Sequence, residues 1–348
     1  MIVRTLAVLG LVSALCNAAE AQTRIKVGST RSTVLGAVLT AKERGYFKDA
    51  GLEVDVEIID ASAGFVPSLA TNQLQVVEGG VSANLFNGIQ QGLPIKIAID
   101  TTSTPIGHNL MVRYDLKDEV KKVTDLKGRV VGLNAPNSIA AYEVTKVLET
   151  AGLDWKDIET KVIPFPQMAV AFSTKAIDAG LLITPYTAQL PAQNLAVRWV
   201  SIDEAVKEAM SISVSMFNTD WAKKEPDTAQ KFYTAMLRGA HDYCNAYHGG
   251  SWRPELLRIL VANGVAPNVE LLDAITWPSR NPDGRIGKEF LLDVQRWYVK
   301  QGLARSELSL DQLVESSLAE NANKAVGPFK LENTASSKSG CGKDAAVR

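Results

Sequence analysis

The sequence is poor in cysteine and histidine, with three of each among 348 residues, and its formal net charge is only −1. Three cysteines cannot build a scaffold held by several disulfides. Beyond the N-terminal segment, no stretch approaches the roughly 18–20 uncharged apolar residues that a membrane-spanning helix needs. A charge near zero also argues against nucleic acid as a partner, since nucleic acids bind strongly basic faces. The composition therefore indicates a globular protein that is large enough for two domains.

The common signatures of catalysis and cofactor binding are absent as well. The chain has no G-x-G-x-x-G, G-x-x-x-x-G-K, G-x-S-x-G or H-E-x-x-H motif. The segment HDYCNAYH places three metal-ligand types, His241, Cys244 and His248, on one helical stripe. However, Cys244 also continues an apolar stripe, and His248 stands where the helix ends, a favourable place for a histidine. We favour packing over metal binding and expect no cofactor, no metal site and no enzymatic activity.

The N-terminus has the pattern of a secretory signal peptide. Arg4 precedes an apolar run from Leu6 to Leu15, and Ala19-Glu20-Ala21 supplies an A-x-A cleavage signal. We therefore expect residues 1–21 to be removed and the mature protein to be periplasmic.

Two cysteines, Cys244 and Cys341, remain after this removal. An oxidising compartment would allow them to pair. Cys341, however, lies in the Ser/Gly/Lys-rich stretch SSKSGCGK, which is typical of disorder. We expect residues 331–348 to form a disordered tail, and whether the two cysteines pair stays open.

From residue 24 onward, short β-rich runs alternate with segments of helical periodicity. This alternation predicts an α/β fold with mostly parallel sheets covered by helices on both faces. After about residue 216 the pattern becomes helical. The expected strands are 24–28, 52–59, 75–79, 95–100, 110–113, 129–133, 160–164, 179–184 and 197–200.

The chain also contains an internal repeat. Gly28 aligns with Gly132, and Leu74 falls near Ile177. Each copy has the order strand, small polar loop, helix, Gly-Leu turn, strand, helix and strand. The period far exceeds that of a solenoid, so the repeat predicts two similar, doubly wound α/β lobes.

The candidate binding residues follow the expected strands, because ligands of open α/β sheets bind beyond the carboxyl ends of the strands. Hydroxyl and amide side chains dominate there, and only Arg31 and Asp60 are charged, which suits binding more than catalysis. In KVGSTRST a strand leads directly into a helix, whose free N–H groups favour an oxyanion. The candidate ligand-binding residues are Ser29, Thr30, Arg31, Ser32, Gly64, Phe65, Gly80, Ser82, Asn84, His108, Asn134, Asn137, Ser138, Gln167, Thr184, Tyr186 and Ser213.

Several of these residues have a second interpretation. Ser29, Ser32 and Ser138 are also suitable helix caps. Arg31 is either a bidentate clamp on a carboxylate or sulfonate, or a solvated surface charge. His108 lies between the two expected lobes, either as a hinge residue or as a donor to the cleft.

The chain resembles the solute-binding proteins of nitrate/sulfonate/taurine-type ABC importers over roughly residues 24–320, in the ordered segments AKERGYFKDAGLEVDVEII, LATNQLQVVEGGVSANL, VTDLKGRVVGLN and STKAIDAGLLITPYTAQL. The resemblance implies a type II periplasmic-binding fold, in which two crossing segments, near 102–109 and 211–217, join two lobes. Lobe I would comprise residues 22–105 plus 212–330, and lobe II residues 106–211.

The resemblance also implies an exported receptor that delivers a small ligand to an ABC importer permease and closes on it by a hinge motion. We expect a monomer that binds a small organic anion: a sulfonate, a carboxylate or a nitrate-like ion. Many relatives carry an acidic residue before the proline of Thr184-Pro185-Tyr186, and its absence here disfavours an amine-bearing ligand.

Three points stay open. Trp277 would either form an aromatic wall of the site or pack inside lobe I. A thiamine-pyrimidine-synthase-like enzyme is an alternative function, which the lack of a cysteine run and the signal peptide disfavour. A periplasmic sensor protein is the other alternative, and it predicts the same cleft.

Overall fold

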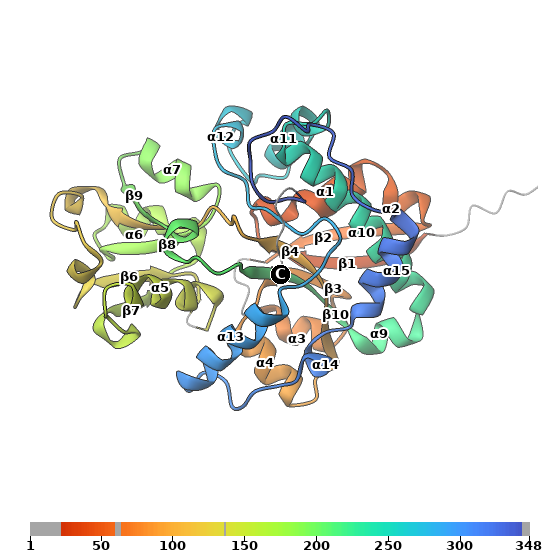
Figure 1. The fold of residues 1–348 in the computed structure, drawn as a ribbon, viewed down its shortest axis with the longest axis horizontal. Coiled ribbons are helices and arrows are strands. Elements are labelled where there is room, and N and C mark those ends of the chain that lie inside the picture. Colours follow the sequence, from red (N-terminus) through yellow and green to blue (C-terminus); the bar gives the residue numbers. More distant parts are fainter. Residues whose placement is uncertain (1–21, 60–63, 136, 343–348) are drawn as a thin grey trace, which may run out of the picture.

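The computed structural model describes residues 22–59, 64–135 and 137–342, which form two α/β lobes (Figure 1). Within these residues, ten strands are arranged in two five-stranded sheets. The expected signal peptide and Asp60 lie outside the described residues. The expected α/β architecture with two lobes is confirmed. The expectation of mostly parallel sheets is wrong for the strand pairing, because each sheet receives an antiparallel strand from a crossing segment and is therefore mixed.

Sheet I has the strand order β2-β1-β3-β10-β4. β1 pairs in parallel with β2 and β3, whereas β10 runs antiparallel to both β3 and β4. We call this sheet and the helices that cover it lobe I. Its strands are β1 (Thr23–Ser29), β2 (Leu52–Ile58), β3 (Val76–Gly80), β4 (Ile95–Ser103) and β10 (Ser211–Asn218).

Sheet II has the order β7-β6-β8-β5-β9 and is the centre of lobe II. β6 pairs in parallel with β7 and β8, whereas β5 runs antiparallel to both β8 and β9. Its strands are β5 (Asn109–Arg113), β6 (Val130–Leu133), β7 (Glu159–Val162), β8 (Ala179–Leu182) and β9 (Ala196–Ser201).

The two sheets have the same arrangement, as the internal repeat predicts. In each sheet the antiparallel strand is the one that follows a crossing between the lobes. A Cβ on Gly28 would lie 2.7 Å from Leu74, and a Cβ on Gly132 would lie 2.9 Å from Ile177. The residues matched in the repeat therefore make the same contact, in which a strand glycine admits a large aliphatic side chain.

The chain crosses between the lobes at residues 104–108, after β4, and at residues 206–210, before β10. The second crossing comes earlier than the range expected from the resemblance, because residues 211–218 already pair within sheet I. Both crossings run close together, since Thr104 N donates to Met210 O at 2.9 Å.

Lobe I carries most of the helices (Figure 1). They are α1 (Gly36–Glu43), α2 (Tyr46–Asp49), α3 (Phe65–Ala70), α4 (Ala83–Gln90), α9 (Thr219–Lys224), α10 (Pro226–Tyr247), α11 (Arg253–Ala262), α12 (Val269–Asp273), α13 (Lys288–Lys300), α14 (Leu310–Leu313) and α15 (Ser316–Val326). Lobe II has α5 (Ile139–Glu149), α6 (Met168–Ser173), α7 (Tyr186–Ala192) and α8 (Ile202–Ala205).

The longest of these helices, α10, covers sheet I together with α1. Pro226 occupies its first turn, where a missing N–H costs nothing. Its buried face carries Phe232, Met236 and Ala240 at helical spacing. Phe232 stacks on Phe47 of α2, with ring centroids 5.2 Å apart. This side of sheet I thus forms one continuous apolar core.

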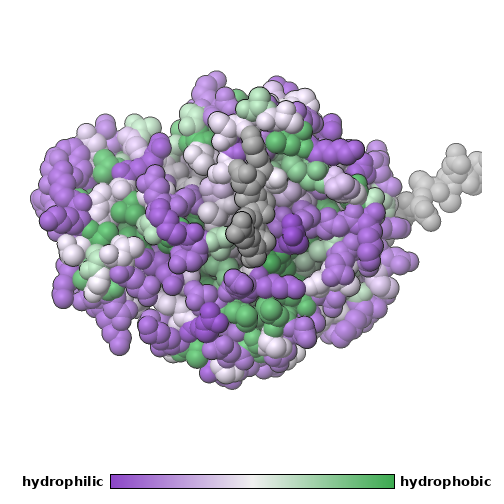
Figure 2. Space-filling model, in the orientation of Figure 1, coloured by the Kyte–Doolittle hydropathy of each residue, from purple (hydrophilic) through white to green (hydrophobic). Residues whose placement is uncertain are grey.

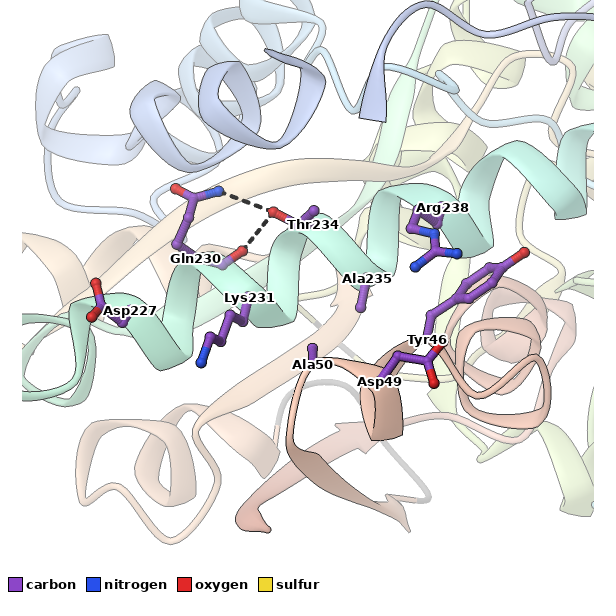
Figure 3. Close-up of a pocket in the computed structure, with 9 residues that line it drawn as sticks. All are labelled: Tyr46, Asp49, Ala50, Asp227, Gln230, Lys231, Thr234, Ala235 and Arg238. Carbon is purple, nitrogen blue, oxygen red and sulfur yellow. Dashed lines mark hydrogen bonds between the residues drawn. The ribbon is translucent and has the colours of Figure 1, made fainter. Parts of the chain in front are cut away.

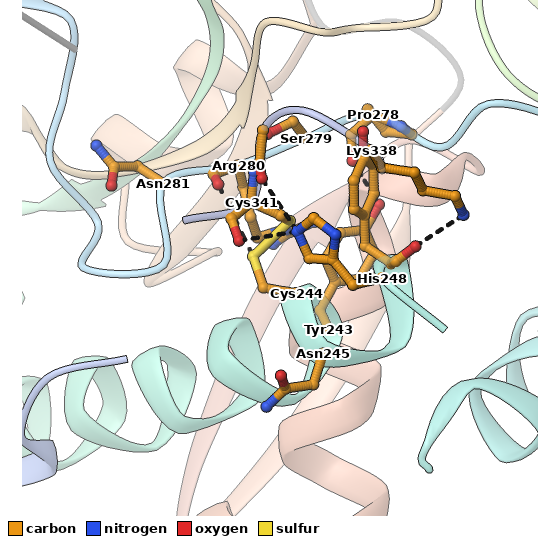
Figure 4. Close-up of a disulfide and its surroundings, with 12 residues drawn as sticks. Tyr243, Cys244, Asn245, His248, Pro278, Ser279, Arg280, Asn281, Lys338 and Cys341 are labelled. Atoms are coloured by element: carbon orange, nitrogen blue, oxygen red, sulfur yellow. Dashed lines mark hydrogen bonds between the residues drawn. A yellow bond between two sulfur atoms is a disulfide. The ribbon is translucent and has the colours of Figure 1, made fainter. Parts of the chain in front are cut away.

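The C-terminal segment differs from the expected disordered tail. Its described part, residues 331–342, lies along the C-terminal end of α10, and a disulfide joins Cys244 to Cys341 with Cα atoms 5.0 Å apart (Figure 4). His248 contacts Ser336, with Nδ1 and Oγ 2.9 Å apart. The polar composition suggested disorder, but the covalent bond and these side-chain contacts hold the segment. Cys244 is therefore a disulfide partner, which answers the open question about the cysteines.

One helix of the C-terminal part, α13, contacts both lobes. In lobe II, the Tyr142 hydroxyl of α5 donates to Asp293 Oδ2 at 2.6 Å, and the Tyr142 ring meets Phe290 and Trp297 edge to face. In lobe I, Tyr298 packs against Phe86 of α4, with ring centroids 5.9 Å apart. The lobes are thus joined by packing as well as by the crossing segments.

The face seen in Figure 2 is mostly hydrophilic, with apolar residues scattered between charged ones. Large hydrophobic side chains are exposed singly, at Ile58, Tyr114, Val162 and Val170 among the described residues. None of the helices in the described part of the chain is long and apolar enough to cross a bilayer.

Gly28→Ala is expected to lower the free energy of unfolding by about 1–3 kcal/mol. The new methyl group would lie 2.7 Å from carbon atoms of Ile59 and Leu74, so the strand or its neighbours must shift. Gly180→Ala in β8 is the matched control, because its methyl group would meet neighbours only at 3.4 Å or more. Urea unfolding measures both, and equal effects would contradict the proposed contact.

Reduction of the disulfide is expected to lower the free energy of unfolding by about 2–5 kcal/mol, since the bond closes a long loop in the unfolded chain. The two cysteines are separated by 97 residues. The double variant Cys244→Ala/Cys341→Ala should show a similar loss and should not respond to reductant. Urea unfolding with and without dithiothreitol tests this, and an unchanged wild-type midpoint in reductant would count against a stabilising bond.

Candidate functional site

A cavity of about 60 Å³ lies between the two lobes. It is bounded by the carboxyl ends of β1 and β3 in lobe I and of β6 and β8 in lobe II, which is where open α/β sheets bind ligands. The crossing strand β10 closes it on one side through Ile212 and Ser213. Both halves of the internal repeat thus contribute to one cavity.

Seven of the residues predicted from the sequence line this cavity. All but Gly80 have a hydrogen-bonding side chain, and the set comes from both lobes and both crossing regions. These residues are Thr30, Ser32, Gly80, His108, Asn134, Thr184 and Ser213.

The hydroxyl groups after β1 are held by local contacts. Ser32 Oγ accepts a hydrogen bond from Val34 N at 3.3 Å, so Ser32 caps the short 3-10 helix Thr33–Leu35 that leads into α1. Thr30 Oγ1 lies 3.3 Å from Ser32 Oγ. The capping interpretation therefore applies to Ser32, and the same residue still faces the cavity.

Four other predicted residues meet one another beside the cavity. Ala83 N donates to Asn137 O at 3.1 Å, and Asn137 Nδ2 lies 3.4 Å from Asn84 Oδ1. Ser82 pairs with Ser138 in an isolated antiparallel bridge. Ser138 makes no cap with its side chain, since its Oγ donates to Ala135 O and Asn134 Oδ1. Ser82, Asn84, Asn137 and Ser138 thus form a contact between the lobes and do not line the cavity themselves.

The remaining predicted residues lie outside the cavity lining. Arg31 is exposed and its guanidinium lies against Gly264, which agrees with the solvated interpretation. Gln167 is exposed, Ser29 and Phe65 are buried, and Gly64 precedes α3. Tyr186 stacks on the cavity residue Phe165, with ring centroids 5.8 Å apart, so it supports an aromatic wall.

Trp277 packs inside lobe I and does not provide that wall. It is buried, its Nε1 donates to Leu272 O at 2.8 Å, and Arg253 lies over its ring at 4.3 Å. The aromatic residue in the cavity is Phe165, at the start of the 3-10 helix Phe165–Gln167.

The main charged contact of the cavity was only half predicted from the sequence, since Glu143 was not among the candidate residues. His108 Nδ1 lies 3.0 and 3.2 Å from the two carboxylate oxygens of Glu143 on α5, and both residues line the cavity. Glu143 is fully buried. It is the one acidic residue in the stretch IAAYEVTKVL, three positions after Ala140, and an acidic side chain next to the apolar residues of this helix is a signal that could have identified it.

His108 lies at the first crossing segment and also lines the cavity. Its backbone oxygen accepts from Ile202 N at 3.0 Å, which fixes it at the first crossing. Next to it, Asp203 accepts hydrogen bonds from Ile106 N and Gly107 N at 2.7 and 2.8 Å. Residue 108 therefore belongs both to the first crossing segment and to the cavity lining.

A second missed feature is a buried group of charges under the lobe I side of the cavity. Glu78, Asp100 and Arg280 are at most 2% exposed. Burial raises the pKa of Glu78 to about 7, and the positive charge of Arg280 opposes this effect. Burial raises the pKa of Asp100 to about 6, opposed first by the hydrogen bond that its Oδ2 accepts from Asn281 N at 2.9 Å.

Arg280 connects this group to the cavity lining. Its guanidinium stands over the Tyr243 ring at 4.0 Å, and Nη2 donates to Val34 O at 3.3 Å. Val34 and Gly79, the neighbour of Glu78 in β3, both line the cavity. The buried ionisable side chains therefore adjoin residues that line the cavity, but they do not line it themselves.

A larger hollow of about 330 Å³ lies on the surface of lobe I, between α2 and α10 (Figure 3). Its lining includes Lys231, Arg238 and two aspartates, and Arg238 lies over the Tyr46 ring at 3.8 Å. It receives no residue from lobe II and no strand end. We therefore assign the site to the smaller cavity between the lobes.

Metal binding has little support in this part of the molecule. Cys244 is in the disulfide, and His248 Nε2 lies 3.1 Å from Gly340 O. Among residues 22–59, 64–135 and 137–342, no group of three or more His, Cys, Asp or Glu side chains is placed to hold an ion.

Comparison with known proteins identifies relatives in sequence. The family described as NMT1/THI5 like matches residues 32–246. The putative binding protein YtlA of Bacillus subtilis is 26% identical over 65% of this chain and 67% of its own length. The nitrate/nitrite binding protein NrtA of Nostoc sp. is 24% identical over 64% of this chain and 54% of its own length. The aligned part thus spans between half and two thirds of these relatives.

Solved structures give the same fold. The periplasmic nitrate-binding protein NrtA from Synechocystis PCC 6803 superposes with a TM-score of 0.73 at 15% identity, covering 88% of this chain and 89% of that chain. The alkanesulfonate-binding protein SsuA from Xanthomonas axonopodis pv. citri, bound to MOPS, gives 0.69 at 14% identity, covering 85% and 99%. The desulfurization enzyme DSZB gives 0.63 at 17% identity, covering 87% and 99%. The expected type II periplasmic-binding fold is confirmed.

The buried carboxyl of Glu78 predicts a pH dependence of stability. The unfolded chain loses this proton at the ordinary pKa, whereas the folded protein keeps it up to about pH 7, so this group makes the folded state less stable as the pH rises between these values. In Glu78→Gln this contribution is removed. Between pH 4.5 and 8, we expect the unfolding free energy of the variant to rise by roughly 3 kcal/mol relative to that of the wild type.

Urea unfolding at several pH values measures this difference. Glu159→Gln, at an exposed position of β7, is the control for the loss of a carboxylate. A difference between Glu78→Gln and wild type that is constant with pH would contradict a protonated Glu78.

Proposed function

This chain belongs to the NMT1/THI5-like family, and on that basis we propose that it is the solute-binding receptor of an ABC importer. One observation carries the proposal: the cavity lies between the lobes and takes hydrogen-bonding residues from both of them. A ligand held there would bridge the two lobes. The binding proteins for nitrate and alkanesulfonate with the same fold support this reading.

We propose a small organic anion, a carboxylate, sulfonate or nitrate-like ion, as the ligand. The lining is rich in hydroxyl groups, and the first residues of α5, Ile139 and Ala140, bring the positive end of a helix to the cavity. Phe165 supplies an apolar wall. The cavity volume of about 60 Å³ favours a compact ligand, since pockets for drug-sized ligands measure roughly 300 Å³ or more.

We propose that residues 22–105 with 212–330 move as one lobe and residues 106–211 as the other. The crossings at 104–108 and 206–210 support this division, because they alone connect the two sheets along the chain. Closure would then be a rotation about these segments. A receptor of this kind works as an exported monomer that meets a permease, and the A-x-A signal at the N-terminus supports export to the periplasm.

Binding without turnover is the proposed activity. DSZB shows that this fold also accommodates an enzyme. Two findings nevertheless favour a receptor: both cysteines of the described chain are joined in a disulfide, and hydroxyl, amide and apolar groups dominate the cavity. Recovery of the ligand unchanged after incubation would support this assignment, and conversion of the ligand would overturn it.

Calorimetry of the purified protein with nitrate, ethanesulfonate and benzoate tests the proposal. We expect a dissociation constant near micromolar, about −8 kcal/mol, for at least one anion. Thr30→Val should weaken that binding about tenfold or more, because it removes a hydrogen bond to a charged group without a change in shape. Thr71→Val, at an exposed position outside the cavity, is the matched control.

Native mass spectrometry of the protein as purified would reveal a co-purified molecule and extend the panel. If no anion binds and none co-purifies, the proposed function is wrong. Equal affinities of Thr30→Val and Thr71→Val would place the site elsewhere.

A further inference from the structure

The cavity has few ionisable residues for a site that would bind an anion. Among its described lining residues, His108 and Glu143 are the ionisable ones, and neither lysine nor arginine contributes. Arg31, the arginine closest in sequence to the site, is directed to Gly264. A positive charge for an anion must therefore come from His108 or from backbone N–H groups.

Glu143 fixes the state of one ring nitrogen of His108. Its two carboxylate oxygens lie 3.0 and 3.2 Å from Nδ1, and a carboxylate can only accept hydrogen bonds, so Nδ1 carries a proton. Nε2 is then the ring nitrogen left for a ligand. The arrangement resembles those in which a buried carboxylate sets the tautomer and direction of an imidazole.

The charges make the two protonation states of His108 very different for an anion. With a neutral ring, the ligand would face the lone pair of Nε2 with the negative Glu143 behind it, and both repel an anion. With a protonated ring, Nε2–H donates to the ligand, and the positive imidazolium stands between two negative charges.

We propose that His108 is the charge partner of the bound anion, that Glu143 is its positioning residue, and that binding takes up about one proton from solvent onto His108 Nε2. This inference rests on the proposed function and specifies its ligand as a monovalent oxyanion. Atoms balance, because the proton comes from water or buffer and returns there when the ligand leaves.

The other titratable groups around His108 and Glu143 either have hydrogen-bond partners or are buried. Asp203 accepts hydrogen bonds from the backbone N–H groups of residues 106 and 107. Tyr298, on the α13 side of Glu143, is fully buried, and burial raises its pKa well above the ordinary value, with the charge of Glu143 adding to the effect. On the lobe I side, the neighbouring lining groups are neutral: Thr30, Ser32, Thr102 and Ser213.

The experiment is calorimetry of the full mature protein with nitrate, ethanesulfonate and benzoate, in buffers of different ionisation enthalpy, from pH 5.5 to 8.5. The dependence of heat on buffer counts protons. We expect about one proton taken up per anion at pH 8, and an affinity that falls about tenfold for each pH unit on the alkaline side.

Two variants separate the roles. His108→Gln should bind at least tenfold more weakly at pH 6, with no proton uptake and no pH dependence. Glu143→Gln should move the alkaline loss of affinity to lower pH, because the imidazolium loses its negative partner; a purely structural role of Glu143 would not move this profile. Matched controls are His241→Gln on α10 and Glu149→Gln at the exposed end of α5, which should behave as wild type.

Anion binding with zero proton uptake and a flat pH profile would overturn this inference and leave the proposed function intact. Failure of every anion to bind at any pH would overturn both. If a variant does not fold, the proton count of the wild type alone decides.

Discussion

The insertion of β10 between β3 and β4 is the constraint on which the site depends. Ser213 pairs with Gly80, and Val214 with Gly79, so the strand returning from lobe II is held between β3 and the edge strand β4 of sheet I. Because it is antiparallel, its N-terminal end lies beside the carboxyl ends of β3 and β4. The same few residues thus end a crossing, complete a sheet and close the cavity, and none of these roles can change independently.

The buried ionisable side chains behind this strand lower the stability of the fold. A buried carboxylate is unfavourable unless it is paired or protonated. Glu78 faces the α10 side of sheet I, next to Ser215 in the pairing of β3 with β10. Burial raises the pKa of Glu78 and of Asp100, and the nearby positive charge of Arg280 offsets part of this rise. Stacking on the Tyr243 ring keeps Arg280 in place. This group holds the 278–281 loop against sheet I, and Pro278 of that loop lines the cavity.

Much of this architecture follows from patterns that the sequence displays. Strand residues such as Gly28 and Gly132 recur because each sheet needs the same close contact, so the repeat predicts two similar lobes and the sheet edge that borders the cavity. Roles within the site are harder to predict. Glu143 and Arg280 act through partners more than thirty positions away, His108 and Tyr243. The C-terminal segment is polar in composition, yet the bond from Cys341 to Cys244 orders its described part.

Contacts between the lobes outside the cavity also enter the binding energy. Tyr142 on α5 donates to Asp293 on α13, and Ala83 N donates to Asn137 O, so the arrangement described here is stabilised without any help from a ligand. In the proposed hinge motion, opening of the cleft would break such contacts, and a ligand would need to supply only the remaining difference between open and closed states. Affinity would then depend on α13 as well as on the cavity. Since α13 belongs in sequence to the lobe I helices and packs on α5, the proposed motion gives the C-terminal region a route by which to influence closure.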